Sequence, residues 1–333
     1  MKIISHPQNI LNHEKLITIE EATQSFLKRR GYKKINLPVL SPALIPESYL
    51  EVFKTRFRWQ KNSQNLFLTP SPELFLKRLL SSGIGNCYYL GKSFRNADPP
   101  TSLHSFEFTM LEFYRIGANY LDLAEDVLAL LKELAVILNK EPKISYKGNE
   151  IFFDKWEKLK VSEAFEKFTG VEEKELFDHD LFLKRAKEKG YGTEGFTYED
   201  IFSQIYTQEV EPHLGMQGYP TLLYDYPLEF AALAKHNPDG KTSQRFEFYI
   251  RGIELGDCYT ELTDWKEQDL RFKSEQRLRR RQKKLRHPID KGFIEALKYG
   301  LPDCSGIAIG FDRLAMVYAD VKSISDLQLI TII

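Results

Sequence analysis

The chain has 333 residues, enough for one large or two modest domains, and its 47 basic and 47 acidic side chains cancel. This balance argues against a protein that binds nucleic acid or membrane through its overall charge, so either partner would need a local patch. Cys87, Cys258 and Cys304 lie far apart without metal-ligand spacing, which argues against a disulfide scaffold or a zinc site. No apolar run approaches membrane-spanning length, so we expect no membrane association and a cytoplasmic location.

The chain opens with a predicted helix over residues 14–30. Apolar residues recur there at helical spacing, and Gly31 supplies a C-terminal stop. Residues 32–40 then read as a strand. Because Pro38 cannot donate to a strand ladder, we expect this strand at an edge or an interface.

Residues 66–80 predict a short strand, a turn and a helix with one apolar face. Ser71 is a suitable N-cap, Pro72 a suitable first helical residue, and Glu73 stands in the first turn, where the helix dipole favours a carboxylate. Capping alone explains all three residues. Their place directly before the next two strands makes a role in substrate binding worth considering.

Residues 90–115 predict two strands joined by a long polar loop, and the rest of the chain is organised around this ribbon. Alternate residues of the two strands share a face: Tyr89, Gly91, Ser93 and Arg95, then Phe108, Met110, Glu112 and Tyr114. Arginine matches phosphate or carboxylate oxygens in a bidentate way, and an aromatic face can stack a base. A glutamate with a tyrosine can hold an ammonium group. The ribbon therefore suits ATP, although a half-buried hairpin with ordinary surface charges is the alternative.

Residues 121–138 predict an amphipathic helix. Residues from about 140 to 218 differ in character, with charged stretches broken by glycines. We interpret them as an insertion of short helices and not as an independent domain. No internal repeat or low-complexity tract is visible.

Residues 245–264 contain two glutamates, Glu247 and Glu254, that one continuous strand would point to opposite faces. A hairpin turning at residues 250–252 would place them directly across from each other. Facing carboxylates are destabilising unless a cation lies between them, which makes Mg²⁺ with nucleotide phosphates the economical candidate. Two solvated carboxylates on an exposed hairpin are the alternative.

Two further segments complete the chain. Residues 271–286 end in a run of arginines and lysines, which is either a solvated helix face or a docking site for an acidic macromolecule. Residues 300–317 read as a glycine-rich strand running into an apolar helix, with Arg313 at the junction as a possible phosphate clamp. No parallel-strand unit follows, which argues against a dinucleotide-binding fold.

Taken in this order, the segments resemble the three signature motifs of class II aminoacyl-tRNA synthetases. The opening helix with the strand through Pro38 resembles the first motif, Arg95 to Glu112 the second, and residues 310–314 the third. Five stretches resemble the lysine-specific branch: Ser71-Pro-Glu-Leu-Phe-Leu-Lys-Arg, Glu107-Phe-Thr-Met-Leu-Glu-Phe-Tyr, Arg245-Phe-Glu, Glu261-Leu-Thr-Asp and Glu295-Ala-Leu-Lys-Tyr-Gly-Leu-Pro. The resemblance covers nearly the whole chain.

In lysyl-tRNA synthetases an anticodon-binding barrel precedes the first motif. In this sequence the first motif begins near residue 1, so we expect no anticodon binding. The sequence thus resembles the elongation factor P (R)-β-lysine ligase family, truncated paralogues of lysyl-tRNA synthetase. The implied fold is α+β, the class II catalytic fold with a mostly antiparallel sheet flanked by helices, as one domain over 1–333. The implied ligase converts lysine or (R)-β-lysine with ATP to an aminoacyl-adenylate and transfers it to a lysine side chain of translation elongation factor P. A homodimer is also implied, because the first motif forms the dimer interface in this class.

The resemblance also implies residue roles, with Arg95 and Arg313 as the catalytic pair. Arg95 would hold the α-phosphate and the substrate carboxylate, while Phe108 and Arg313 would sandwich adenine. Glu247 and Glu254 would bind Mg²⁺. The residues implied in ATP binding are Arg95, Asn96, Ala97, Asp98, His104, Ser105, Phe108, Glu254, Leu255, Gly310 and Arg313. 

Glu73 would take the amino group near the substrate carboxylate, and Tyr114 with Glu261 would take the distal ammonium. The residues implied in binding the amino acid are Ser71, Pro72, Glu73, Glu112, Tyr114, Asp257 and Glu261.

Three positions depart from the family pattern. The family has Arg-Asn-Glu where this chain has Arg95-Asn96-Ala97-Asp98, so the carboxylate that reads adenine is displaced by one residue unless a bulge restores it. Asp257 replaces an asparagine near the substrate carboxylate, and Cys258 replaces a glycine. Two other functions therefore stay open: a lysyl-adenylate enzyme with tRNA or a small molecule as acceptor, and a catalytically silent paralogue that senses an amino acid.

Overall fold

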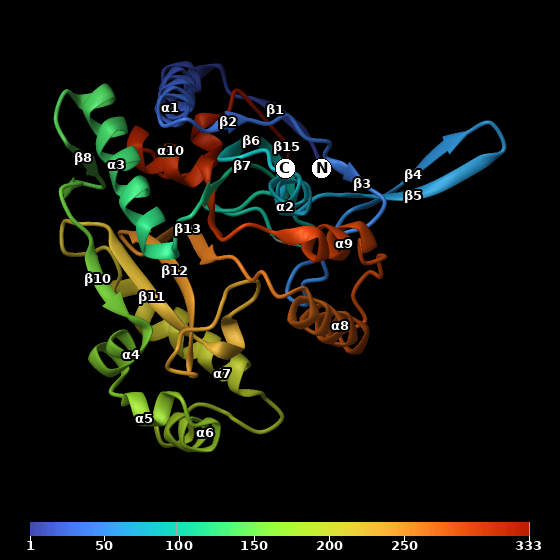
Figure 1. Ribbon diagram of the computed structural model, residues 1–333. Helices are drawn as coiled ribbons and strands as arrows, with labels where there is room; N and C mark the ends of the chain where they lie inside the picture. Colours follow the sequence, from blue (N-terminus) through green and yellow to red (C-terminus); the bar gives the residue numbers. More distant parts are fainter. Residues whose placement is uncertain (98, 333) are drawn as a thin grey trace. The chain divides into compact units, whose positions relative to one another are not determined.

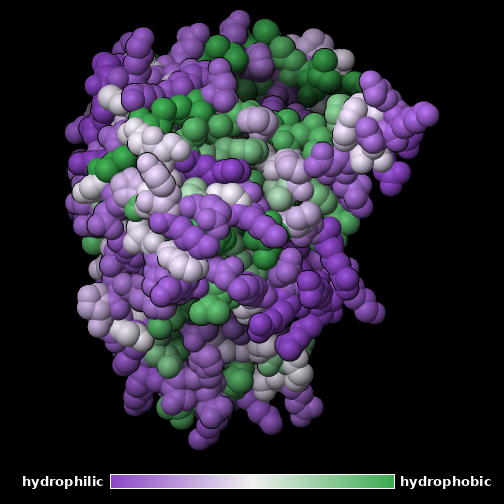
Figure 2. Space-filling view, turned by 45° about the vertical axis from the view of Figure 1, so that its right-hand side comes forward, coloured by the Kyte–Doolittle hydropathy of each residue, from purple (hydrophilic) through white to green (hydrophobic). Residues whose placement is uncertain are grey.

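The computed structural model describes residues 1–97 and 99–332, and the chain forms two compact units (Figure 1). The first unit consists of Met1–Ala118 and Glu261–Ile333, and the second of Asn119–Thr260. Within the described residues, no helix is both long enough and apolar enough to cross a membrane. The face drawn in Figure 2 is largely hydrophilic, with hydrophobic residues in separate patches.

The sheet of the first unit is built around the predicted ribbon, in the order β14–β7–β6–β2. Its strands are β2 (Lys33–Lys34), β6 (Cys87–Phe94), β7 (Glu107–Ile116) and β14 (Cys304–Gly310). Both β6 and β14 pair antiparallel with β7, and β2 pairs parallel with β6. Leu111 and Phe113, on the face of β7 opposite to Glu112 and Tyr114, are fully buried. The ribbon predicted over residues 90–115 is therefore confirmed.

The helices of the first unit are α1 (Ile10–Arg29), α2 (Glu73–Ser81), α8 (Trp265–Arg281), α9 (Lys291–Gly300) and α10 (Phe311–Ala319). Three of them, α1, α2 and α10, occur where the sequence predicts them, whereas α8 ends at Arg281, before the end of the basic run at residue 286, and α9 is an additional helix. Helix α10 follows β14 directly and packs against α1 and β7, so nearly all of its residues are buried. This packing on two sides fixes the strand-to-helix junction that carries Arg313.

Two smaller sheets complete the first unit. One pairs β1 (Ile3–Ser5) with β15 (Ile330–Ile332), and the other has the order β3 (Leu40–Ser41), β5 (Asn62–Leu68), β4 (Lys54–Trp59). The prediction of one strand over residues 32–40 is wrong for the middle of this range. Within it, only β2 and the first residue of β3 are strand. The ladder of β2 with β6 ends after the N–H of Ile35 donates to the carbonyl of Tyr88 (2.8 Å), shortly before Pro38, which has no N–H to donate.

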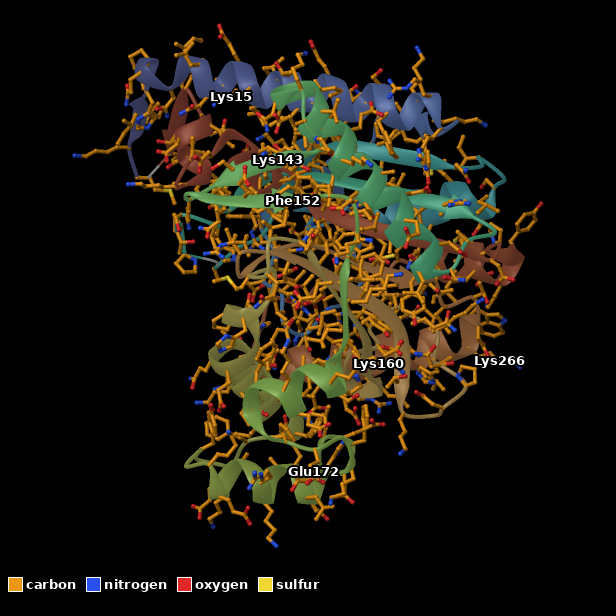
Figure 3. The ribbon with its side chains drawn as sticks, turned by 90° about the vertical axis from the view of Figure 1, so that its left-hand side faces the viewer. Lys15, Lys143, Phe152, Lys160, Glu172 and Lys266 are labelled. Carbon is orange, nitrogen blue, oxygen red and sulfur yellow. The ribbon has the colours of Figure 1, made fainter. Side chains whose placement is uncertain are left out.

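The second unit has a sheet in the order β10–β11–β12–β13. Its strands are β10 (Glu157–Lys160), β11 (Thr221–Pro227), β12 (Thr242–Ile250) and β13 (Ile253–Thr260), and only the β10–β11 pair is parallel. A separate hairpin joins β8 (Lys143–Tyr146) to β9 (Asn149–Phe152). Lys143 and Phe152, labelled in Figure 3, face each other across it, and the Lys143 ammonium lies 5.8 Å from the ring centroid.

Helices of the second unit include α3 (Tyr120–Asn139), which confirms the helix predicted over 121–138. The short helices are α4 (Val161–Thr169), α5 (Glu173–Leu176), α6 (His179–Glu188) and α7 (Tyr198–Ile205), which continues as a π-helix (Tyr206–Val210). They fall within the predicted range of 140–218, whereas β8, β9 and β10 were not predicted there. The single-domain interpretation stays a prediction. Single 3₁₀ turns occur at Pro7–Asn9, Glu211–His213, Leu228–Phe230 and Ile324–Leu327.

Candidate active site

The β6–β7 ribbon gathers the predicted residues on one face. In its register, Ser93 lies opposite Phe108, Gly91 opposite Met110, Tyr89 opposite Glu112 and Cys87 opposite Tyr114. Residues directly opposite in an antiparallel pair point to the same side of the sheet. The face predicted from alternation is therefore confirmed, with an aromatic ring at one end and a carboxylate and a phenol at the other.

Arg95 stands just beyond β6, where its N–H donates to the carbonyl of Phe106 (3.0 Å). Its guanidinium carbon lies over the Phe108 ring, 5.3 Å from the centroid, in a cation–π contact. The Nε atom of Arg95 is buried and has no hydrogen-bond partner among the described residues. A buried donor left without an acceptor is costly, so this arginine is suited to receive an anionic ligand.

Arg313 lies in the first turn of α10, which begins directly after Gly310. Its Nε donates to the carbonyl of Leu103 (3.1 Å), and Nη2 donates to Nε2 of His104 (2.7 Å). His104 is held in turn by Thr101, which contacts its Nδ1 (3.1 Å). The structure thus brings Arg313 and His104 together, as the resemblance implies, at the loop between β6 and β7.

That loop also carries the position that departs from the family. The N–H of Asn96 donates to the carbonyl of Glu51 (2.9 Å), and Ala97 has a left-handed backbone with φ of 67°. Ser105, half-buried, lies near the end of the loop. Asp98, the carboxylate displaced by one residue from the family position, lies outside the described residues.

Glu112 is the centre of a buried polar cluster and is 2% exposed. Tyr114 donates to its Oε1 (2.8 Å) and Ser71 to its Oε2 (2.8 Å). Burial, followed by the nearby Glu73 carboxylate, raises the pKa of Glu112 to about 8, although both hydrogen bonds favour the charged form. Glu112 is therefore poised to change charge near neutral pH.

Ser71 and Pro72 connect this cluster to α2. The helix begins at Glu73, one residue later than predicted, and Pro72 occupies the position before it. The prediction that Ser71 is the N-cap is wrong by one residue, because Pro72 is the N-cap. The Ser71 hydroxyl still accepts from the N–H of Glu73 (3.0 Å), the first helical residue, while it donates to Glu112.

Lys77 belongs to the same cluster, although sequence reasoning did not single it out. Its ammonium lies between two carboxylates, 2.6 Å from Oε2 of Glu261 and in contact with Oε1 of Glu73 one helical turn earlier. Burial alone would lower the pKa of Lys77, but the charges of Glu261 and Glu73 outweigh it and raise the pKa well above its usual range. The four-residue spacing from Glu73 was visible in the sequence, whereas burial and the contact with Glu261 were not.

Glu261 and Tyr114 meet beside Gly306 of β14. The N–H of Glu261 donates to the carbonyl of Cys304 (3.0 Å), and Gly306 pairs with Tyr114 across the β14–β7 ladder. A Cβ atom on Gly306 would lie 2.2 Å from Cε1 of Tyr114 and 2.6 Å from Oε1 of Glu261. The missing side chain of Gly306 therefore leaves room for Tyr114 and Glu261.

Glu247, Glu254 and Asp257 belong to the second unit. The predicted hairpin is confirmed, but the prediction that Glu247 lies opposite Glu254 is wrong: Glu247 pairs with Asp257, and Glu254 with Tyr249. The turn consists of Arg251 and Gly252, both with positive φ. It lies one residue later in the chain than a turn that would pair Glu247 with Glu254. A bulge at Leu255 then keeps both glutamates on one face, because one strand gains an extra residue.

The carboxylates on this face have protein partners. Glu247 contacts Nη2 of Arg245 (2.6 Å) and accepts from Tyr206 (3.3 Å) and from Tyr249. Asp257 accepts a hydrogen bond from Tyr259, and Cys258 is fully buried on the opposite face, across from Phe246. No group of three or more His, Cys, Asp or Glu side chains in the described part of the chain is arranged to hold a metal ion.

Comparisons with known proteins show the family of the chain. The family described as tRNA synthetases class II (D, K and N) matches residues 5–331. A curated relative from Yersinia enterocolitica, named elongation factor P–(R)-β-lysine ligase, is 34% identical over 323 residues, 95% of this chain and 94% of that protein. A relative of the same name from Salmonella dublin is 34% identical over 330 residues, 97% of this chain and 96% of that protein. The chain therefore belongs to the class II tRNA synthetase (D, K and N) family, and among its members to the elongation factor P–(R)-β-lysine ligases.

Proposed function

We propose that this protein uses ATP to activate lysine or (R)-β-lysine as an aminoacyl-adenylate and transfers it to a lysine side chain of translation elongation factor P. The observation that carries this proposal is the single ribbon face that joins Arg95 and Phe108 to the buried cluster of Glu112 and Tyr114. An anion site and an ammonium site on one face suit a substrate with a carboxylate at one end and an amine at the other. The shared name of the relatives supports the same acceptor and amino acid.

Arg95 is the residue proposed to act on the reacting groups. Its buried Nε has no hydrogen-bond partner within residues 1–97 and 99–332, and the ring of Phe108 holds the guanidinium in place. A guanidinium so placed would neutralise phosphate and carboxylate oxygens as they approach each other, which removes much of the barrier to attack on phosphorus. Arg313 and His104 are proposed to hold the remaining phosphates from the loop side, and Phe108 to stack adenine.

The buried acidic cluster is proposed to bind the amino groups. Glu73 would pair with the amine nearer the carboxylate, while Glu261 and Tyr114 would receive the distal ammonium. Glu112 supports Tyr114 through the hydrogen bond at Oε1. Such a site rejects an amino acid without the distal amine, because buried carboxylates would then lack a counter-charge.

Mg²⁺ is proposed to accompany ATP, and Glu247 and Glu254 are its proposed ligands. Both are carboxylates on one face of the β12–β13 hairpin, and Mg²⁺ commonly takes one or two carboxylates together with substrate phosphates. Its charge would screen the phosphate oxygens during nucleotide binding. The guanidinium of Arg245 lies on the same face, 2.6 Å from the carboxylate of Glu247, and orients it.

A homodimer and a cytoplasmic location complete the proposal. The helix α1 and the segment through Pro38 correspond to the motif that forms the dimer interface in this class.

The test has two stages. Purified protein with Mg²⁺ and ATP should catalyse exchange of labelled pyrophosphate when lysine or (R)-β-lysine is added, and should then transfer labelled amino acid to elongation factor P. Norleucine in place of lysine is the matched control. Exchange without transfer would favour tRNA or a small molecule as acceptor, and an absence of exchange with every lysine isomer would overturn the enzyme assignment.

A further inference from the structure

Lys77 is a cation buried inside the cluster that is proposed to bind a cationic substrate. Its side chain is 2% exposed, and its two partners, Glu261 and Glu73, are 1% and 13% exposed. A buried ammonium is costly unless it is paired and hydrogen-bonded, and here two carboxylates supply that compensation. Lys77 therefore engages, in the folded protein, the same carboxylates that are proposed to receive substrate amines.

Ionisable side chains from α2, from β7 and from the segment beside β14 face one another around Lys77. Glu73 and Lys77 come from α2, Glu112 and Tyr114 from β7, and Glu261 lies beside β14. Burial raises the pKa of Tyr114, and the charges of Glu112, Glu73 and Glu261 raise it further. All three carboxylates therefore lie close to this phenol. From β6, Cys87 and Tyr89 also face Glu112, and burial with that charge raises the pKa of both. With the thiol and the phenols neutral, and with Glu112 ionised as an arriving ammonium group favours, three carboxylates and one ammonium leave two surplus negative charges.

We propose that Lys77 is a specificity-determining residue. Its buried ammonium bridges Glu73 and Glu261 and reduces the net charge of the cluster to two negative charges, which a substrate with two ammonium groups neutralises. The inference rests on the proposed function and names a residue that sets its substrate class. Lysine and β-lysine meet this requirement alike, because moving one amine along the chain leaves the number of amines unchanged. Amino acids with a single amine leave one buried carboxylate without a counter-charge.

The bridge also holds the two carboxylates in place, because the ammonium contacts Oε1 of Glu73 and Oε2 of Glu261. Their like charges repel each other in a low-dielectric site, and the ammonium between them offsets that repulsion. Each ionised carboxylate has about four acceptor positions, so a contact with Lys77 leaves room for a substrate ammonium.

The test is replacement of this one charge by a neutral side chain of similar length. In Lys77→Met, selectivity for lysine over norleucine, measured as the ratio of kcat/KM in pyrophosphate exchange, should fall by at least about tenfold at pH 7, while the KM for ATP changes by less than about twofold. Lys77→Arg keeps the charge and should retain the preference for lysine.

Arg78→Met is the matched control. It removes a positive charge from the next residue of α2, where the guanidinium is 45% exposed and pairs with Asp290 (2.9 Å). It should leave the selectivity unchanged. If Lys77→Met does not fold, Lys77→Gln supplies an amide that can donate to either carboxylate, and the same loss of selectivity is expected.

Unchanged selectivity in Lys77→Met or Lys77→Gln would overturn the proposal, and so would equal losses of affinity for lysine and for ATP. These outcomes differ from failure of the proposed function, in which the wild-type protein itself would show no exchange. If the wild type shows no exchange, calorimetric titration of lysine and norleucine into the wild type and Lys77→Met measures binding directly. An equal preference for lysine over norleucine in both proteins would refute the role of Lys77.

Discussion

The phenol of Tyr114 donates a hydrogen bond to Oε1 of Glu112, two residues earlier on β7, over 2.8 Å. Alternation in the strand places both side chains on one face, and the Ser71 hydroxyl satisfies the second oxygen of the carboxylate (2.8 Å). Glu112 nevertheless has its pKa raised to about 8, because burial and the charge of Glu73 oppose ionisation. An arriving ammonium group would favour the ionised form, so we expect lysine binding to release a proton near neutral pH.

The raised pKa of Glu112 predicts how stability depends on pH. The unfolded chain releases this proton near pH 4.3, whereas the native protein keeps it up to about pH 8. Between these values the native state binds more protons, so the contribution of Glu112 to the free energy of unfolding decreases as the pH rises. Glu112→Gln should flatten that part of the profile, measured by urea unfolding from pH 5 to 8.5.

The control for this experiment is Glu107→Gln, at the exposed start of the same strand. It should leave the slope between pH 5 and 8.5 as in the wild type. A slope in Glu112→Gln as steep as that of the wild type would show that another group causes the pH dependence.

Arg95→Ala should abolish activation and spare the fold. The guanidinium makes a cation–π contact with Phe108, and its Nε has no hydrogen-bond partner among the described residues, so its loss removes little native structure. Loss of charge neutralisation in the transition state should lower the rate of lysine-dependent exchange by at least about 10²-fold. Exchange kinetics and thermal unfolding, measured side by side, check both statements; retained exchange would remove Arg95 from the catalytic role.

Alternation and helical periodicity were enough to predict the ribbon, its polar face and the helix α2. These features depend on local geometry, which repeats every two residues in a strand and about every 3.6 in a helix. Ser71, Glu73, Glu112, Tyr114 and Glu261 were predicted as one binding group only through the family resemblance, and they do lie together. Their contacts join segments far apart in the chain, which no local pattern encodes.

The features that were missed depend on burial and on turn geometry. In the sequence, Lys77 resembles one end of an ordinary helix-surface ion pair with Glu73. The sequence does not reveal that Lys77 is buried and that Glu261 also contacts it. The register of Glu247 and Glu254 depended on a two-residue turn and a bulge, and moving a turn by one residue changes every partner along the hairpin.

Gly306→Ala should disrupt the amino-acid site. The added methyl group would lie 2.2 Å from Cε1 of Tyr114 and 2.6 Å from Oε1 of Glu261, so the ring or the carboxylate must move. We expect a loss of about 1–3 kcal/mol in the free energy of unfolding and a raised KM for lysine. Gly292→Ala is the control, because its new methyl group would meet the mobile end of Arg78. Equal behaviour of the two variants would contradict the close packing at Gly306.

Arg245→Met should destabilise the second unit by leaving Glu247 buried without its cation. The two side chains are 16% and 11% exposed and lie 2.6 Å apart, and the guanidinium also donates to the carbonyl of Phe230 (2.7 Å). Removing one partner of a buried pair typically costs about 3–5 kcal/mol, whereas neutralising both partners costs much less. Urea unfolding of Arg245→Met, Glu247→Gln and the double variant should therefore give a double variant more stable than Arg245→Met. If the two losses simply add, the pair is not coupled, and the carboxylate of Glu247 is held by Tyr206 and Tyr249 without help from Arg245.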